Sequence, residues 1–171
     1  MNRFKEQLAW SAEKSYEGFW NSVYKKAFPN LVKTELCLED MEAQALGIDR
    51  LIHLDNGRIV KVDEKKRSKD YGDILLEYVS NDRTGSPGWV KKNLAIDYIA
   101  YAIVPASRCY LFDWLMLRRA WDFYEEVWKE KYETKSARNP NYNTLSLAVP
   151  TRVLMNAVAM SSVINVSRET K

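Results

Sequence analysis

Acidic and basic residues gather at two points of the segment between residues 47 and 66. Gly47-Ile48-Asp49 opens one β-prone run, and Asp63-Glu64-Lys65-Lys66 closes the next. Carboxylates are ligands that Mg²⁺ prefers, usually one or two of them together with water and substrate phosphate. A lysine beside such a site can orient the attacking water or stabilise the charge that develops at phosphorus. These residue types therefore indicate metal-assisted hydrolysis of a phosphodiester bond.

A predicted β-hairpin brings these two points together. Residues 48–54 and 58–66 have the composition of strands, and Asp55-Asn56-Gly57 between them predicts a tight turn, because Asn and Gly tolerate a positive φ. If the turn centres on Asn56, Asp49 lies opposite Asp63. Two carboxylates that face each other in a plain structural hairpin repel each other. A bound cation relieves that repulsion.

Two frames of the second acidic cluster are open. The acid and the lysine are either Asp63 with Lys65 or Glu64 with Lys66. Side chains alternate along a strand, so only one of these sets shares the face of Asp49. The pairing across the hairpin favours Asp63 with Lys65, and a bulge at the strand end would let Glu64 join them. The alternative interpretation is a solvated strand end whose charges have no catalytic role.

The order of an Asp, one hairpin and then acid-x-Lys resembles the PD-(D/E)XK, or restriction-endonuclease-like, nuclease superfamily. Gly47-Ile48-Asp49 and Val62-Asp63-Glu64-Lys65 carry the resemblance, which extends over residues 2–112. In that family the first Asp and the second acid hold the metal ion, and the Lys acts on the nucleophilic water. The family usually has an apolar residue before the second acid, as Val62 is, and another between acid and lysine. In the frame of Asp63 and Lys65, the residue between acid and lysine is the charged Glu64. In the frame of Glu64 and Lys66 it is the charged Lys65, so both frames depart from the preference for an apolar residue there.

The resemblance implies a set of site residues and a cofactor. Asp49, Asp63 and Glu64 are the expected ligands of Mg²⁺ or Mn²⁺, and the same three with Lys65 and Lys66 form the expected catalytic set across both frames. Family members often add an acid from the first helix, for which Glu13 and Glu17 are candidates. The basic residues expected to contact the phosphates of DNA are Arg67, Lys69, Lys91 and Lys92.

The function implied by the resemblance is a metal-dependent nuclease that acts on DNA, either at ends or at internal sites, in a phage, mobile-element or repair context. A homodimer is one expected assembly, since small nucleases that cut both strands often dimerise. The alternative is a catalytically inactive nuclease-like fold that binds nucleic acid or protein. RNA in place of DNA also agrees with the residues.

The elements that must position these residues follow from periodicity. A helix is predicted over residues 2–28 and ends before Pro29. Strands are predicted at 73–80, 96–104 and 108–112. A second helix, predicted at 113–135, has a stripe of aromatic residues typical of a face that packs on the core. A strand at 145–149, a helix at 151–159 and a last strand or tail at 163–166 follow. We expect an α/β (α+β) fold of the restriction-endonuclease-like kind, with a mixed β-sheet flanked by α-helices, as one domain over residues 1–171.

Composition limits the class of protein. The chain has 171 residues, of which 46% are hydrophobic, and a net charge of +3, so its charge alone does not indicate nucleic acid. The N-terminus does not resemble a signal peptide, and no apolar run has the length of a membrane span. We therefore expect a cytoplasmic protein with no membrane partner. Cys37 and Cys109 are expected to be reduced and buried.

Overall fold

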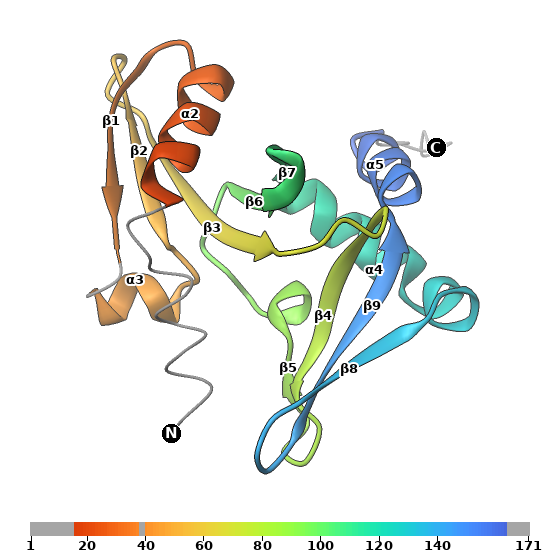
Figure 1. Ribbon diagram of the computed structural model, residues 1–171. Helices are drawn as coiled ribbons and strands as arrows, with labels where there is room; N and C mark the ends of the chain where they lie inside the picture. Colours follow the sequence, from red (N-terminus) through yellow and green to blue (C-terminus); the bar gives the residue numbers. More distant parts are fainter. Residues whose placement is uncertain (1–15, 38–39, 164–171) are drawn as a thin grey trace, which may run out of the picture. The chain divides into compact units, whose positions relative to one another are not determined.

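The computed structural model describes residues 16–37 and 40–163, and the chain divides into two compact units. The first unit comprises Met1–Tyr71 and Asn93–Trp114, and the second comprises Gly72–Lys92 and Leu115–Lys171. Each unit has its own β-sheet, and the described residues contain four α-helices, so the fold is mixed α+β (Figure 1). A single domain over residues 1–171 stays a prediction. Each helix of the described residues is too short or too polar to cross a membrane.

The first unit contains a five-stranded sheet in the order β1-β2-β3-β6-β7. Its strands β1 to β3 form an antiparallel meander, β3 pairs with β6 in parallel, and β6 pairs with β7 in antiparallel fashion. The elements are α2 (Glu17–Ala27), β1 (Leu31–Leu36), α3 (Met41–Ala45), β2 (Arg50–Leu54), β3 (Ile59–Arg67), β6 (Tyr98–Ile103), the 3-10 turn η3 (Val104–Ala106) and β7 (Arg108–Asp113).

The hairpin of β2 and β3 has the predicted turn and register. The amide of Leu54 donates to the carbonyl of Arg58 over 2.9 Å, and the side chain of Asn56 accepts from the amide of Arg58 over 3.0 Å. Gly57 has a φ of 80°, a conformation that glycine adopts without strain. Arg50 pairs with Val62 at the far end of the ladder. The next residues outward on the two strands are Asp49 and Asp63.

The helix α2 packs on one face of this sheet through a buried cluster. Trp20 and Tyr24 of α2 contact inward residues of three strands, among them Ile52, Val60 and Val62. Each of these strand residues is separated by one residue from the next inward residue, which is the period of two of a half-buried strand. The predicted helix ends before Pro29, as expected, and its predicted part at residues 2–15 lies outside the described residues.

The second unit contains a four-stranded sheet in the order β5-β4-β9-β8. Trp121 of α4 is buried and stacks on Tyr78 of β4 with ring centroids 6.1 Å apart, so the aromatic stripe of α4 is a packing face. The elements are β4 (Asp73–Asn81), β5 (Ser86–Pro87), the 3-10 turn η2 (Trp89–Lys91), α4 (Trp114–Lys131, whose first residue belongs to the first unit), β8 (Thr134–Arg138), β9 (Asn143–Pro150) and α5 (Thr151–Met160).

Two sequence expectations about the sheets were wrong. One mixed sheet was expected, but there are two: the strand predicted at 73–80 is present as β4 and pairs with β5 and β9 in the second sheet. The helix predicted at 113–135 ends at Lys131, and Thr134–Arg138 forms β8. All five residues of β8 are exposed, so neither face of the strand is buried. The strand therefore lacks the apolar residue at every second position from which a strand is predicted. Most of the segment at 163–166 lies outside the described residues.

Candidate functional site

Asp49 and Asp63 lie side by side where the ladder of β2 and β3 ends. The amide of Asp49 donates to the carbonyl of Val62 over 2.9 Å, which fixes the backbone of Asp49 against β3. The amide of Glu64 donates to Oδ2 of Asp49 over 2.8 Å, so the carboxyl group of Asp49 turns toward β3. The carboxyl groups of Asp49 and Asp63 also share a hydrogen bond. The hairpin thus brings together the two acids that sequence pairing placed opposite each other.

Lys65 completes this group on the same face of β3. Its ammonium forms an ion pair with Oδ1 of Asp63, two residues earlier on the strand. The side chain of Asp63 is only 4% exposed, whereas that of Lys65 is 29% exposed. The carboxyl group is therefore shielded from water, and the lysine side chain stays partly open to solvent.

The electrostatics of Asp49 differ from those of an ordinary aspartate. Burial, and then the negative charge of Asp63, raise the pKa of Asp49 to about 7, although Lys65 and the amide of Glu64 offset part of the rise. Near neutral pH the carboxyl group of Asp49 therefore retains its proton much of the time. A second positive charge beside the pair would replace that proton.

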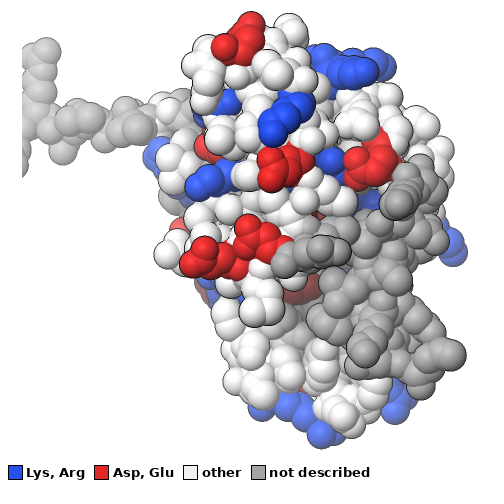
Figure 2. Space-filling model, turned by 90° about the vertical axis from the view of Figure 1, so that its left-hand side faces the viewer, with Lys and Arg blue, Asp and Glu red and all other residues white. Residues whose placement is uncertain are grey.

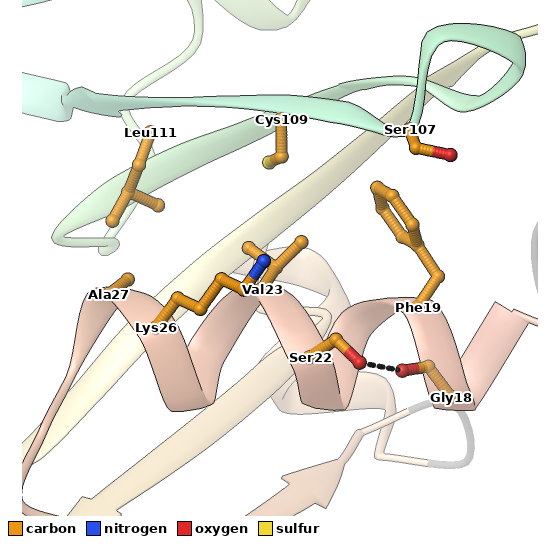
Figure 3. A pocket seen from close by; sticks show the side chains of 9 residues that line it. All are labelled: Gly18, Phe19, Ser22, Val23, Lys26, Ala27, Ser107, Cys109 and Leu111. Carbon is orange, nitrogen blue, oxygen red and sulfur yellow. Dashed lines mark hydrogen bonds between the residues drawn. The ribbon is translucent and has the colours of Figure 1, made fainter.

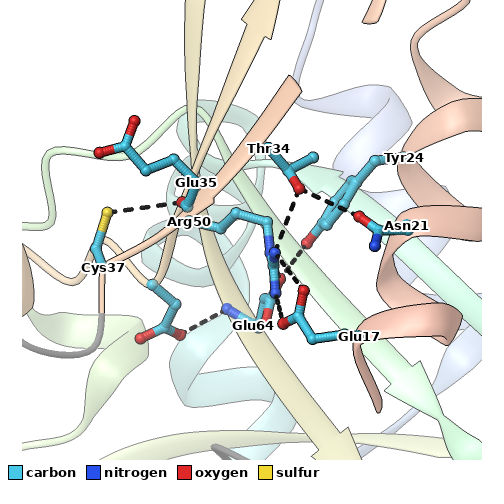
Figure 4. A network of polar contacts seen from close by, with 9 residues as sticks. Glu17, Asn21, Tyr24, Thr34, Glu35, Cys37, Arg50 and Glu64 are labelled. Atoms are coloured by element: carbon cyan, nitrogen blue, oxygen red, sulfur yellow. Dashed lines mark hydrogen bonds and ion pairs between the residues drawn. The ribbon is translucent and has the colours of Figure 1, made fainter. Parts of the chain in front are cut away.

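Glu64 points to the opposite face of β3, toward α2, where it joins an ion network (Figure 4). Its Oε1 accepts from Nε of Arg50 over 2.5 Å and from the hydroxyl of Tyr24 over 2.8 Å. The other end of the Arg50 guanidinium binds Glu17 of α2, with Nη2 donating to Oε1 over 2.6 Å. Because Arg50 is 1% exposed, this network is a buried link between α2, β2 and β3.

The pKa values in this network follow from burial and pairing. Burial raises the pKa of Glu64, and Arg50 and Tyr24 offset part of that rise. Burial, and then the charge of Glu64, raise the pKa of Tyr24 well above its ordinary value, so the phenol stays a donor. Burial alone would lower the pKa of Arg50, but the bonds from Glu17 and Glu64 outweigh it. A cation between two anions, all hydrogen-bonded, is an arrangement that a fold can bury.

The remaining predicted catalytic and metal-binding residues lie away from the Asp49 pair. Lys66 follows Glu64 on the α2 face, with its ammonium 4.1 Å from the ring centroid of Tyr16. Glu17 is bound to Arg50, and Glu13 lies outside the described residues. The structure therefore brings Asp49, Asp63 and Lys65 together on one face, and it places Glu64 and Lys66 on the other.

The four residues predicted to contact nucleic acid divide between the two units. In the first unit the guanidinium of Arg67 lies 4.9 Å from the ring centroid of Tyr71, and Lys69 is exposed. In the second unit Lys91 forms an ion pair with Glu125 over 2.7 Å, and Lys92 is exposed. On the face shown in Figure 2, basic and acidic side chains of the described residues are intermixed rather than gathered by sign.

The donor set of the Asp49 pair suits a cation that needs few protein ligands. Among the described residues, no group of three or more His, Cys, Asp or Glu side chains is arranged to hold a metal ion. A structural zinc or calcium site normally requires more protein ligands than two carboxylates. Mg²⁺ is commonly bound by one or two carboxylates, with water and substrate phosphate as its other ligands. Asp49 and Asp63 fit that requirement.

A separate hollow of about 660 Å³ lies between α2 and β7 in the first unit (Figure 3). Phe19, Val23 and Leu111 contribute apolar side chains to it, with Cys109 at its wall and Lys26 at its rim. Burial raises the pKa of Cys109 to about 12, so this thiol is a packing group and a poor nucleophile. None of the predicted catalytic residues lines this hollow.

Comparison with protein-family models, with curated proteins and with solved structures found no match. The candidate site therefore rests on its own geometry.

Sequence reasoning did not find the role of Arg50, although a signal for it was present. Arg50 precedes Ile52 and Leu54 by steps of two, and all three are buried on one face of β2. An arginine in register with the apolar face of a strand must bury its guanidinium and needs anionic partners there. Glu64 stands in the same register as Val60 and Val62 on β3. Strand alternation thus indicated both members of the pair.

Proposed function

We propose that this chain is a metal-dependent nuclease that hydrolyses phosphodiester bonds of DNA on a restriction-endonuclease-like variant of the α+β fold. The observation that carries the proposal is the contact between the carboxyl groups of Asp49 and Asp63, which come from adjacent strands, with the ammonium of Lys65 on the same face. Two acids in contact destabilise the fold unless a cation or a proton lies with them.

Asp49 and Asp63 would hold Mg²⁺ or Mn²⁺. The ion, when bound, supplies a Lewis acid that polarises the phosphate and stabilises the charge of the transition state. The amide of Glu64 holds the carboxylate of Asp49 in orientation, and the ion pair with Asp63 holds the ammonium of Lys65 at the partly exposed rim. From there Lys65 orients the attacking water. Arg67 and Lys69, from the same unit, would contact phosphates of the backbone.

The departure from the family pattern has a physical account in this frame. The residue between acid and lysine faces away from the site, into the core beneath α2, where the family usually places an apolar side chain. Here that residue is Glu64, and the guanidinium of Arg50 neutralises it. A charged residue between the acid and the lysine is therefore compatible with Asp63 and Lys65 as the catalytic acid and lysine, and this supports the proposal.

A catalytically inactive fold that binds nucleic acid or protein is the second candidate. The observation in its favour is the small number of acids: within the described residues the Asp49 pair has no third acidic partner suited to a metal ion. A proton on Asp49 then takes the place of a metal ion. Such a protein would bind its partner without cleaving it.

A nuclease assay tests the proposal. The purified protein is incubated with linear, circular and single-stranded DNA in Mg²⁺, in Mn²⁺ or in EDTA. We expect cleavage that needs the metal ion and falls by at least about a hundredfold in Asp49→Ala and in Asp63→Ala, the usual scale for losing one charge-stabilising group. Asp122→Ala is the matched control, because this aspartate is 60% exposed on α4 and belongs to the second unit.

Cleavage in EDTA, or cleavage that survives Asp49→Ala, would contradict the proposal. Absence of cleavage on all three substrates, together with no binding of Mg²⁺ or Mn²⁺ by calorimetry, would favour the binding fold. Circular DNA that is cut identifies an endonuclease, and degradation confined to linear DNA identifies an exonuclease.

A further inference from the structure

Two loops of the second unit form a polar hollow of about 390 Å³. One is the turn between β4 and β5, which contributes Arg83, and the other is the tip of the β8–β9 hairpin, which contributes Arg138 and the segment from Asn139 to Asn143. In Figure 1 these two tips lie next to each other. The lining residues are two arginines, three asparagines, a proline and a tyrosine. None of them is acidic.

Hydrogen bonds between the two loops hold this hollow in shape. Asp82 accepts from the amide of Asn143 over 2.8 Å and from its side chain over 2.7 Å, and the amide of Asp82 donates to the carbonyl of Asn143 over 3.0 Å. Thr144 donates to the carbonyl of Ser80 over 3.0 Å. Within the hairpin tip, the amide of Asn139 donates to the carbonyl of Tyr142 over 2.8 Å. The two loops are thus fixed relative to each other before any ligand binds.

Within the described residues neither arginine of the hollow has an ion-pair partner, and the charge of Asp82 offsets that of Arg83 only in part. Both side chains are exposed, and no hydrogen bond or ion pair from the described part of the chain reaches either guanidinium. The nearby acid is Asp82, whose carboxylate is already bonded to Asn143; those bonds lower the pKa of Asp82, so it stays an anion. Two cations against one carboxylate leave the hollow positive. By contrast, Lys91 and Lys129 of the same unit are both paired with Glu125.

The chemistry of this lining suits an oxyanion. A guanidinium donates two parallel hydrogen bonds to a phosphate, and it is less strongly hydrated than an ammonium. The side-chain amides of Asn139 and Asn143 already donate to Thr144 and Asp82. The amide of Asn141 adds a neutral donor of the kind that bonds phosphate and sugar oxygens. A hollow made by two fixed loops reduces the ordering cost of binding for the residues on it.

We propose that the hollow between Arg83 and Arg138 binds the phosphodiester backbone of a nucleic acid. This inference rests on the proposed function for the identity of the polymer, but it assigns binding to a second surface whose residues take no part in hydrolysis. Contacts to phosphates position a nucleic acid without reading its sequence.

The test measures binding without cleavage. Fluorescence anisotropy of a labelled duplex oligonucleotide is followed in EDTA at several salt concentrations, with the full chain. We expect the double variant Arg83→Ala/Arg138→Ala to bind about tenfold more weakly near 0.1 M salt, and its salt slope to fall by about 2, because each phosphate contact contributes roughly 0.9. The matched control is Lys131→Ala/Arg152→Ala, which removes the same charge from the same unit. Arg83→Lys/Arg138→Lys should recover part of the affinity.

If both alanine double variants lose the same affinity, the effect comes from net charge alone and the proposal is overturned. It is also overturned if Arg83→Ala/Arg138→Ala binds like wild type, or if the wild-type protein does not bind the duplex. The nuclease assay separates this proposal from the function above. Arginine-dependent binding without cleavage supports the hollow and contradicts the nuclease. Cleavage that survives loss of both arginines, with unchanged binding, supports the nuclease and contradicts the hollow.

Discussion

The two faces of β3 hold similar charges in opposite arrangements. On the α2 face Arg50 lies between Glu17 and Glu64 and bonds to both. On the other face Asp49 and Asp63 contact each other, and the cation Lys65 lies toward the solvent side. Arg50 is 1% exposed, whereas the Lys65 side chain is 29% exposed. The α2 face has the arrangement of a structural ion link, and the Asp49 face retains repulsion that a cation from solution can relieve.

This difference has a general meaning for acids on a sheet. Burial alone does not mark a functional carboxylate, because Glu64 is buried as well and serves the fold. The distinguishing feature is whether the fold places a buried cation against the acid and neutralises its charge. Removal of charge should therefore have opposite effects on stability at the two faces, and the following variants test that contrast.

The largest expected effect is on the α2 face. Arg50→Ala leaves the buried Glu64 without its cation, while Glu17 is partly exposed to solvent, so we expect the free energy of unfolding to fall by about 3 kcal/mol. Urea unfolding followed by circular dichroism measures this loss. Arg50→Lys is the control, because lysine keeps the positive charge but cannot donate to both glutamates through a planar guanidinium. A loss below about 1 kcal/mol for Arg50→Ala would show that the network adds little to stability.

A smaller effect of opposite sign is expected on the other face. The pKa of Asp49 is about 7 in the folded protein and 3.8 in its ordinary state, so the folded state holds the extra proton between these values. The stabilisation is complete below about pH 4 and is lost as pH rises through 7. At pH 8 without metal, Asp49→Asn should therefore raise the free energy of unfolding, by at most about 4 kcal/mol at roughly 1.4 kcal/mol per unit of pKa, and by about 2 kcal/mol where water screens half of the charge.

Urea unfolding at pH 5 and at pH 8, in EDTA, measures this effect. The gain from Asp49→Asn should be larger at pH 8 than at pH 5, since wild type still holds the proton at the lower value. The neighbouring substitution Asp55→Asn, at the exposed hairpin turn, is the control for an aspartate without a buried partner. A variant less stable than wild type at pH 8 would mean that the Asp49 carboxylate is matched by the fold, as Glu64 is.

The hairpin and its site were predictable because their signals are local. Asn56 and Gly57 mark the turn, and equal spacing on either side of it places Asp49 opposite Asp63. The period of two then separates Asp63 and Lys65 from Glu64 and Lys66. The inward position of Arg50 follows from the same period, although only the structure identified its partners in α2 and β3.

The remainder of the fold depends on pairings that no local pattern encodes. The parallel pairing of β3 with β6 joins strands separated by the whole of β4, β5 and η2. The fully exposed strand β8 has no periodicity of apolar residues, and its pairing with β9 decides its structure. The hollow of Arg83 and Arg138 is made by two loops that are distant in sequence, so neither arginine differs from an ordinary surface residue until the loops meet.

The most direct test of the central claim compares the two neighbouring lysines on opposite faces of β3. Cleavage of linear DNA in Mg²⁺ is followed under single-turnover conditions with enzyme in excess, so that differences in binding do not affect the rate. Lys65→Ala should slow cleavage by about 10²–10⁴-fold, the range for a group that assists proton transfer, while Lys66→Ala should cleave at nearly the wild-type rate. A loss in Lys66→Ala that equals or exceeds the loss in Lys65→Ala would contradict the assignment of chemistry to the Asp49 face.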